Sequence, residues 1–536
     1  MSERPDRNHI DASLSDRPNR AQVDPTAGLE HGFSSVRSTD DFRQRVPIVT
    51  YDSFSPFIDR MLHGERNVLV PEKVQFWSAT AGTTGYRKLV PITESYRRQF
   101  QLTMHLWLHS VGQDHPHATD GKLVYFVAPP RVDVAPDGTP IGNMSGYNFQ
   151  RVPALLRRLY AVPLAAFEIR DPDVRSYVIA RCALAQDVTW LVAISSHPLH
   201  ALFETLRTRA DELLRDLKDG TVSVPIPNEL KDELRPYFSS DRKAAARIEK
   251  RARFAGGLTP RAAWPNLRLM TSWTHGAGAS FLPDVMAAVP GVPVRGGMYA
   301  ASEGWFTIPR SDGDVPGVLA VNANFYELIP VNDAGEDNGD PLLAHEVVDK
   351  GRYNLVITTG AGLARYKLDD LVEVDGFHHR APRLRFVQKA GAALNLYHDL
   401  TTETHARQAV AAASRTVGTV VSRWAMAQSR GQGQGGARRY TFLIEGAASV
   451  PDDEGDRALA RALDEALQAA NYNYKKDRGD KIIAPCTVSR VAPGGFSKVQ
   501  VARGKHGHAG DQMKPLCIIK ENSVRDLFTV EHEVSG

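Results

Sequence analysis

The spacing of apolar and polar residues along the chain predicts a mixture of strands and helices. Residues 123–129 and 189–195 are short, continuous apolar runs, which are typical of buried strands. Over residues 202–217 the apolar side chains recur every three or four positions, so we expect one amphipathic helix that ends at Gly220. Residues 353–377 alternate apolar and polar side chains around glycines, a pattern that predicts antiparallel strands.

The pattern restarts beyond about Lys389 and predicts a second domain. The elements expected there are a helix over 405–414, strands over 419–427 and 439–445, a low-complexity loop over 428–437, and a helix marked by Leu459, Leu463 and Leu467. Together these patterns predict an α/β protein with a large N-terminal α/β domain over residues 33–388 and a small C-terminal α+β domain over residues 389–536. Residues 1–32 are polar, mixed in charge and poor in apolar side chains, which predicts a disordered tail.

Composition narrows the class of protein. Hydrophobic residues make up 42% of the 536 positions and charged residues 24%, which is typical of a soluble globular protein and excludes a wholly disordered or fibrous one. No apolar run approaches the roughly 18 residues of a membrane-spanning helix, and the first residues carry no apolar signal core, so we expect a cytoplasmic protein without a membrane partner. Lysine and arginine number 65 against 62 for aspartate and glutamate, an excess too small to indicate a nucleic-acid partner. The three distant cysteines, Cys182, Cys486 and Cys517, fit reduced thiols better than a disulfide framework.

The stretch of the chain richest in candidate chemistry reads Ser-Ala-Thr-Ala-Gly-Thr-Thr-Gly-Tyr-Arg-Lys over residues 78–88. Its glycines let the backbone approach an anion closely, and its hydroxyls and backbone N–H groups can donate to phosphate oxygens. It lacks the Gly-Lys-Ser/Thr ending of a Walker loop. If this stretch stood alone in the sequence, a solvated Gly/Thr turn would be the alternative interpretation. The phosphate-binding candidates are Thr80, Gly82, Thr83, Thr84, Gly85 and Lys88.

This string resembles the phosphate-binding signature of the luciferase-type adenylate-forming superfamily. Further segments resemble one branch of it, the auxin-responsive promoter family of acyl acid–amido synthetases. The resemblance runs in order from about Phe42 to Lys514 and so covers most of the chain. The segments that carry it are residues 42–65, 88–93, 264–278, 298–304, 324–330, 353–374 and 471–478.

Residues 299–303, Tyr-Ala-Ala-Ser-Glu, resemble the second signature of that superfamily. The aromatic ring of Tyr299 can lie against adenine, and the hydroxyl of Ser302 can donate to the α-phosphate. The carboxylate of Glu303 can hold Mg²⁺ beside the phosphates, because Mg²⁺ prefers oxygen ligands. Taken alone, the segment would be a turn after a strand, so the interpretation depends on its order after the first signature.

Residues 366–370, Tyr-Lys-Leu-Asp-Asp, resemble the third signature, Tyr-Arg-x-Gly-Asp. The resemblance makes Tyr366 a nucleotide-binding candidate and assigns Asp370 to the ribose hydroxyls. Asp369 stands where the family has glycine. If the backbone there needs a positive φ, aspartate tolerates it better than most residues. A second carboxylate would still repel nucleotide phosphate, and a solvated acidic turn is the alternative.

The C-terminal signatures are more diverged. Residues 385–389 stand where the family has Phe-Val-Gly-Arg before a domain hinge, which makes Lys389 a nucleotide-binding candidate. Residues 510–515 echo a Gly-Gln-x-Lys-x-Pro-Arg element with one insertion and one deletion, and they make Lys514 the candidate for a catalytic lysine that meets the α-phosphate. An exposed tail lysine is the alternative for Lys514.

The resemblance implies the adenylate-forming enzyme fold, with a small mobile C-terminal domain acting as a lid. It implies ATP and Mg²⁺ as cofactors, a carboxylic acid as substrate and an amine, most simply an amino acid, as acceptor. The acid would become an acyl-adenylate and then an amide. Two alternatives stay open: an acyl-coenzyme A or carrier-protein ligase with the same first step, and a non-catalytic nucleotide- or acyl-binding protein.

Overall fold

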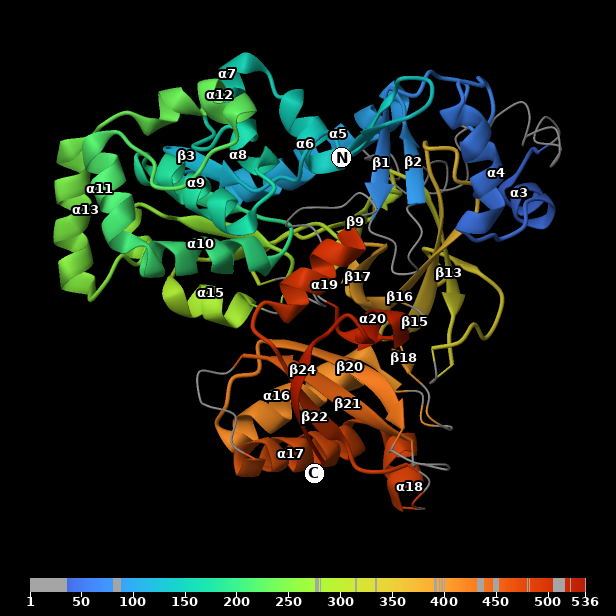
Figure 1. Ribbon diagram of the computed structural model, residues 1–536. Helices are drawn as coiled ribbons and strands as arrows, with labels where there is room; N and C mark the ends of the chain where they lie inside the picture. The colour runs from blue at the N-terminus through green and yellow to red at the C-terminus, as the bar shows by residue number, and fades with distance from the viewer. Residues whose placement is uncertain are drawn as a thin grey trace, which may run out of the picture.

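The computed structural model describes residues 36–80, 88–274, 279, 281–313, 316–332, 335–389, 393–394, 396, 399, 401–430, 438–446, 453–479, 481, 483–504, 516–520 and 522–535. The predicted tail, residues 1–32, lies outside this range. The upper part of the molecule is built on several sheets, and a separate sheet with its own helices forms the lower part (Figure 1).

A parallel sheet forms the core of one half of the upper part (Figure 1). Its strands lie in the order β3 (Lys122–Tyr125), β6 (Val188–Val192), β7 (Leu269–Ser272) and β8 (Val294–Gly296), and neighbouring strands are parallel. Helices cover both faces, which explains why β3 and β6 appear in the sequence as the predicted continuous apolar runs. The main covering helices are α5 (Glu94–Asp114), α9 (Pro172–Leu184), α10 (Ser196–Thr208), α11 (Ala210–Asp219), α13 (Arg242–Ala255) and α15 (Leu282–Ala288).

The single helix predicted over residues 202–217 is wrong, because the chain forms two helices there, α10 and α11. The break falls at Arg209, whose φ of −114° and ψ of 25° are not helical. Leu206 before the break and Leu213 after it are both buried in the same core, so the apolar spacing continues across the break and conceals it. The predicted stop at Gly220 is confirmed: it ends α11 with a φ of +76°.

A four-stranded sheet carries the first signature. Its order is β2 (Lys88–Ile92), β1 (Phe76–Thr80), β5 (Pro140–Gly142) and β4 (Asp133–Val134). Strands β1 and β2 are antiparallel and Thr80 pairs with Lys88, so both ends of the signature lie at one edge of this hairpin. Helices α3 (Thr39–Arg45) and α4 (Tyr51–Leu62) lie beside it (Figure 1).

A seven-stranded sheet carries the third signature. Its order is β11 (Thr307–Ile308), β12 (Gly317–Leu319), β17 (Ala381–Lys389), β16 (Tyr366–His378), β15 (Arg352–Thr358), β13 (Phe325–Pro330) and β14 (Leu342–Leu343). Its neighbouring strands are antiparallel. Strands β15 and β16 confirm the alternation predicted over residues 353–377.

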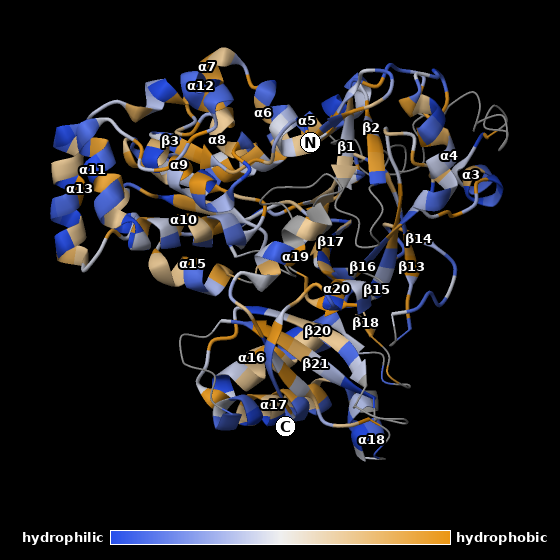
Figure 2. Cartoon of the chain, viewed as in Figure 1, coloured by the Kyte–Doolittle hydropathy of each residue, from blue (hydrophilic) through white to orange (hydrophobic). Residues whose placement is uncertain are grey.

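The C-terminal part has its own core. Its sheet runs β23 (Ile518–Ile519), β20 (Arg423–Arg430), β21 (Arg438–Glu445), β22 (Thr487–Val491) and β24 (Val530–Ser535). Helices α16 (Glu403–Val417) and α17 (Asp453–Ala470) pack on it, and Figure 2 shows apolar residues concentrated on its strands. Three expected elements are confirmed as α16, β21 and α17. Strand β20 begins later than expected and occupies the first three residues of the predicted loop, whose other residues lie outside the described chain.

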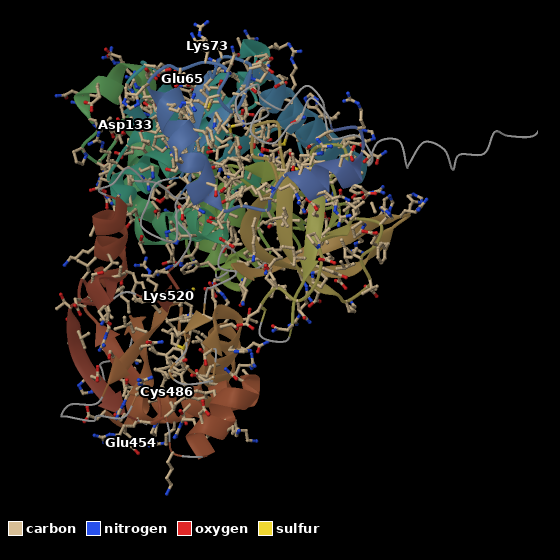
Figure 3. The ribbon with its side chains drawn as sticks, turned by 90° about the vertical axis from the view of Figure 1, so that its right-hand side faces the viewer. Glu65, Lys73, Asp133, Glu454, Cys486 and Lys520 are labelled. Carbon is tan, nitrogen blue, oxygen red and sulfur yellow. The ribbon has the colours of Figure 1, made fainter. Side chains whose placement is uncertain are left out.

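All three cysteines lie in the interior of the protein. Cys182, Cys486 and Cys517 are buried and free, and Figure 3 labels Cys486 inside the C-terminal part. No helix in the described part of the chain is long and apolar enough to span a bilayer.

The remaining elements are α6 (Met144–Gln150), α7 (Ala154–Arg157), α8 (Leu164–Glu168), η4 (Asn228–Leu230), α12 (Lys231–Leu234), η5 (Arg235–Phe238), α14 (Pro260–Ala263), β9 (Ala300–Ala301), β10 (Gly304–Trp305), β18 (Ala393–Leu394), β19 (Thr401–Thr402), α18 (Tyr472–Gly479), α19 (Gly495–Gly504) and α20 (Asn522–Arg525).

Candidate active site

The first and second signatures are in direct contact. Ser78 on β1 is fully buried, and its Oγ donates to Oγ of Ser302 at 3.0 Å. Ser302 lies in the turn between β9 and β10. The hydroxyl of Tyr96, from α5, donates to the Ser302 carbonyl at 2.8 Å. The turn that carries Ser302 and Glu303 is thus held from two sides.

The first and third signatures also meet. Nζ of Lys88, the first residue of β2, donates to the Tyr366 hydroxyl at 3.2 Å. The same nitrogen lies 5.4 Å from the ring centroid of Tyr51 and 5.8 Å from that of Tyr366, which is cation–π range. The Lys88 charge therefore sits between two aromatic rings at the junction of two sheets.

The second and third signatures are joined by Tyr299, whose hydroxyl donates to Oδ2 of Asp370. Both residues are buried. Burial, and then the Asp370 charge, raises the pKa of Tyr299 well above its ordinary value, so the hydroxyl stays a donor. The Tyr299 ring packs against Phe306 and Phe386, with centroid distances of 4.9 and 5.5 Å.

Glu303 is a buried carboxylate, 6% exposed, that no described side chain hydrogen-bonds or ion-pairs. Burial raises the pKa of Tyr51 to about 12, and the Glu303 charge adds to this rise. Burial and then the same charge also raise the pKa of Tyr96 and of Tyr366. A buried carboxylate without a cation is unfavourable, so the site fits a positive ligand. No cluster of three or more metal-binding side chains occurs among the described residues, but Mg²⁺ usually needs only one or two carboxylates beside substrate phosphates.

Asp369 has a φ of +58°, so the position where the family has glycine does need a left-handed backbone. Its charge contributes to the raised pKa of Tyr366, after burial and Glu303. Its carboxylate therefore lies close to the junction where Lys88 and Tyr366 meet.

The other predicted residues are placed only in part. Thr80 ends β1 opposite Lys88, and Lys389 ends β17 opposite Asp370. Both therefore lie on strands that lead into the junction. The remaining candidates, Gly82, Thr83, Thr84, Gly85 and Lys514, lie outside the described residues.

A small cavity borders the second signature. It is lined by Tyr96, Gln99, Phe100, Thr103, Gly304, Trp305, Ala323 and Asn324. The rings of Phe100 and Trp305 meet edge to face at 4.1 Å. Oε1 of Gln99 is buried and has no hydrogen-bond partner in the described part of the chain. Three of the eight lining residues are thus aromatic, and Oε1 of Gln99 is left as an acceptor for a donor.

Sequence reasoning missed Tyr51 and Tyr96, which hold the signatures in place. The hydroxyl of Tyr51 donates to the Leu89 carbonyl at 2.9 Å and accepts from the Leu89 N–H at 2.6 Å. Tyr51 lies within a segment that carries the family resemblance, but no spacing pattern separates it from an ordinary core tyrosine. Tyr96 is likewise one of several apolar-facing residues of a long helix.

The sheet arrangement and the three joined signatures are those expected of an adenylate-forming enzyme. Comparison with known families makes the assignment specific: residues 24–294, 317–389 and 404–523 match the N-terminal, central and C-terminal domains of the GH3 family. The chain belongs to the GH3 family, which confirms the resemblance seen in the sequence. It is a ligase of the amido synthetase type.

Curated relatives agree over nearly the whole chain. The indole-3-acetic acid-amido synthetase GH3.8 of Oryza sativa subsp. indica is 28% identical over 524 residues, covering 92% of this chain and 86% of its own. The indole-3-acetic acid-amido synthetase GH3.3 of Arabidopsis thaliana is 26% identical, covering 91% and 85%. Among solved structures, a GH3.15 acyl acid amido synthetase matches with a TM-score of 0.81 at 20% identity, covering 98% of this chain and 96% of that one. A second structure of that protein, in complex with 2,4-DB, matches with a TM-score of 0.83, also at 20% identity and covering 98% and 95%.

Proposed function

We propose that this chain uses ATP to adenylate an aromatic carboxylic acid and then transfers the acyl group to an amino acid. In the first step a carboxylate oxygen attacks the α-phosphorus and pyrophosphate leaves. In the second step the amino nitrogen attacks the acyl carbon, AMP leaves and the nitrogen loses a proton. Neither step needs a protein nucleophile, so catalysis depends on positioning and charge stabilisation.

The observation that carries the proposal is the convergence of the three signatures through Ser78–Ser302, Lys88–Tyr366 and Tyr299–Asp370. These pairs come from three separate sheets or hairpins. Such a junction suits a nucleotide whose phosphates, ribose and base must be held at once. In this proposal Lys88 and Ser302 face the phosphates, and Thr80, Gly82, Thr83, Thr84 and Gly85 also bind them.

Asp370 is proposed to accept hydrogen bonds from the ribose, with Tyr299 fixing its orientation. Tyr366 and Lys389 complete the nucleotide contacts. Glu303 is the residue that would hold Mg²⁺, which would neutralise phosphate charge when bound. Its burial without a cationic partner among the described side chains supports this role.

We propose an aromatic acid from the relatives and not from the small cavity beside the second signature, whose volume of about 10 Å³ is near that of one water molecule. Related enzymes are named for indole-3-acetic acid, which is such an acid. These names support this class of acid without selecting one compound.

The C-terminal part is proposed to move as a lid between the two steps, with Lys514 reaching the α-phosphate when it closes. Of the features that this proposal needs, only the connection between the upper and the C-terminal part lies within the described residues. Thr404, on α16, donates to Gln388 Oε1, on β17, at 3.0 Å, just before the predicted hinge. Figure 3 shows Lys520 on the side of the C-terminal part that faces the rest of the molecule, and Glu454 at its outer end.

Exchange of pyrophosphate into ATP in the presence of carboxylic acids tests the first step. We expect exchange that depends on an aromatic acid, followed by an amide product when amino acids are added, detected by mass spectrometry. A thioester formed with coenzyme A would instead identify an acyl-coenzyme A ligase. Absence of exchange with every acid would leave a binding protein and contradict the proposal.

A further inference from the structure

A buried ion pair lies directly before Tyr366. The guanidinium of Arg365 donates to both carboxylate oxygens of Glu327, each at 2.8 Å. The two side chains are 7% and 1% exposed. A two-pronged contact of this kind fixes the orientation of both groups, because the planar guanidinium matches the carboxylate.

The same arginine binds the N-terminal segment of the protein. Its Nη1 donates to the carbonyls of Arg43 and Val46, each at 2.6 Å. The Arg365 carbonyl accepts from the Val49 N–H at 3.1 Å, and the Lys367 N–H donates to the Val49 carbonyl at 2.9 Å. Residues 43–49 are therefore attached by backbone and side chain to the start of β16.

The backbone of Arg365 is strained, with a φ of +46°. A left-handed conformation at a residue other than glycine is unfavourable and persists only where surrounding contacts enforce it. Here the enforcing contacts are the Glu327 pair, the two carbonyls and a bond from the Arg365 N–H to Oγ1 of Thr358 at 2.9 Å. The strain lies one residue before the hydroxyl that Lys88 contacts.

The far end of the same N-terminal segment holds Lys88 itself. Tyr51, the first residue of α4, exchanges two hydrogen bonds with the Leu89 backbone and lies under the Lys88 ammonium group. Residues 43–51, which we name the N-terminal clamp, thus hold Lys88 through Tyr51 and Tyr366 through Arg365.

We propose that Arg365 is a positioning residue that, with Glu327 and the N-terminal clamp, holds Tyr366 against Lys88 and so sets the affinity for ATP. The proposal rests on the nucleotide site described above. An ion pair with a purely structural role would stabilise the fold, and its loss would affect ATP and acid alike. Loss of a positioning residue would instead weaken the affinity for ATP and leave the affinity for the acid unchanged.

The test is Arg365→Lys, which keeps the charge and removes the two-pronged contact. Arg352→Lys is the matched control, because Arg352 pairs with Glu373 at 3.1 Å on the same sheet but is 56% exposed. ATP dissociation constants come from calorimetry, and Michaelis constants for ATP and acid from pyrophosphate exchange. We expect Arg365→Lys to weaken ATP binding at least about fivefold while changing the Michaelis constant for acid less than about twofold. The control should change neither.

Tyr51→Phe provides a second variant should Arg365→Lys fail to fold. It removes the bonds to Leu89, leaves the Arg365 pair intact and is expected to weaken ATP binding in the same selective way. Equal effects on ATP and acid, or a lower melting temperature with unchanged ATP binding, overturn the proposal. If no acid supports exchange but wild type binds ATP and the variants bind it more weakly, the proposed function falls and this inference stands.

Discussion

Glu303 combines burial, negative charge and the absence of a cationic side-chain partner in the described chain. This combination favours function over stability, because the charge is costly until a cation arrives. Replacing it with glutamine keeps the shape and removes the charge. We expect adenylation to fall about 10- to 150-fold, corresponding to the loss of a charge-assisted contact of ~1.5–3 kcal/mol, while the melting temperature stays the same or rises.

Pyrophosphate exchange at saturating Mg²⁺ and thermal unfolding check this prediction together. Glu65→Gln is the control, since Glu65 is an exposed carboxylate on the outside of the molecule (Figure 3). Exchange at the wild-type rate in Glu303→Gln would remove Glu303 from the reaction. A large loss of stability would instead give it a structural role.

At Asp369, two substitutions can measure the effect of backbone strain and the effect of negative charge separately. Its φ of +58° favours glycine, and its carboxylate lies near the proposed phosphate contacts. Asp369→Asn removes only the charge and is expected to strengthen ATP binding with little change in stability. Asp369→Gly removes charge and strain but adds freedom to the unfolded chain, so its free energy of unfolding should change by less than about 1 kcal/mol.

Calorimetric titration with ATP and urea unfolding of both variants decide the question. Weaker ATP binding by Asp369→Asn would mean that the second carboxylate takes part in the nucleotide contact. In that case the ribose assignment would have to include Asp369 beside Asp370.

For individual residues, the sequence predicted the signature residues and their order but not the side chains that hold them in place. Tyr96 contacts Ser302 from 206 positions away, and Glu327 contacts Arg365 from 38 positions away. Local spacing carries no information about such partners, because they meet only after the sheets have assembled.

Helix ends were predictable where a single residue decides them. Gly220 ends α11 with a φ of +76°, and a Cβ there would come within 3.0 Å of the Ser240 nitrogen. Gly256 ends the neighbouring helix α13 with a φ of +72°, and a Cβ there would meet nothing within 4 Å. A comparison of Gly220 with Gly256 therefore separates the free-energy cost of a left-handed backbone from the cost of a steric contact.

Both alanine variants should be less stable than wild type. We expect Gly256→Ala to lose about 1–2 kcal/mol from the left-handed backbone alone, and Gly220→Ala to lose more because the Ser240 backbone must shift. Urea unfolding of the two variants measures the difference. Equal losses of stability would show that the backbone around Ser240 shifts without a free-energy cost.

The break between α10 and α11 was not predictable in the same way. Arg209 is neither glycine nor proline, and the apolar side chains on both sides of it face one core. Tertiary packing, rather than a local signal, decides where one helix stops and the next begins.

At the scale of the whole molecule, the sequence predicted the α/β class and the adenylate-forming fold, because the signatures occur in a fixed order. The domain boundary at residues 388 and 389 stays a prediction, although β17 ends at Lys389. The joining of three sheets at one site was beyond sequence reasoning. It depends on pairs such as Lys88–Tyr366, which lie 278 positions apart.

The buried tyrosines at this junction predict how stability depends on pH. Burial raises the pKa of Tyr51 to about 12 and also raises the pKa values of Tyr96, Tyr299 and Tyr366. An unfolded tyrosine titrates near pH 10, so above that pH the unfolded chain binds fewer protons than the folded one. Stability from these groups is therefore complete below about pH 10 and is lost as the pH rises toward the folded pKa values, by about 1.4 kcal/mol per pH unit for each tyrosine.

Urea unfolding between pH 8 and pH 11 measures this loss, and tyrosinate absorbance follows the ionisation directly. We expect the free energy of unfolding to be level up to about pH 9.5 and then to fall, with a shallower fall in Tyr51→Phe because one linked group is gone. In the folded protein only part of the 16 tyrosines should ionise near pH 10, whereas all should do so in urea. A folded protein whose tyrosines all titrate near pH 10, or whose stability is level to pH 11, would contradict the burial of these hydroxyls at the junction of the three sheets.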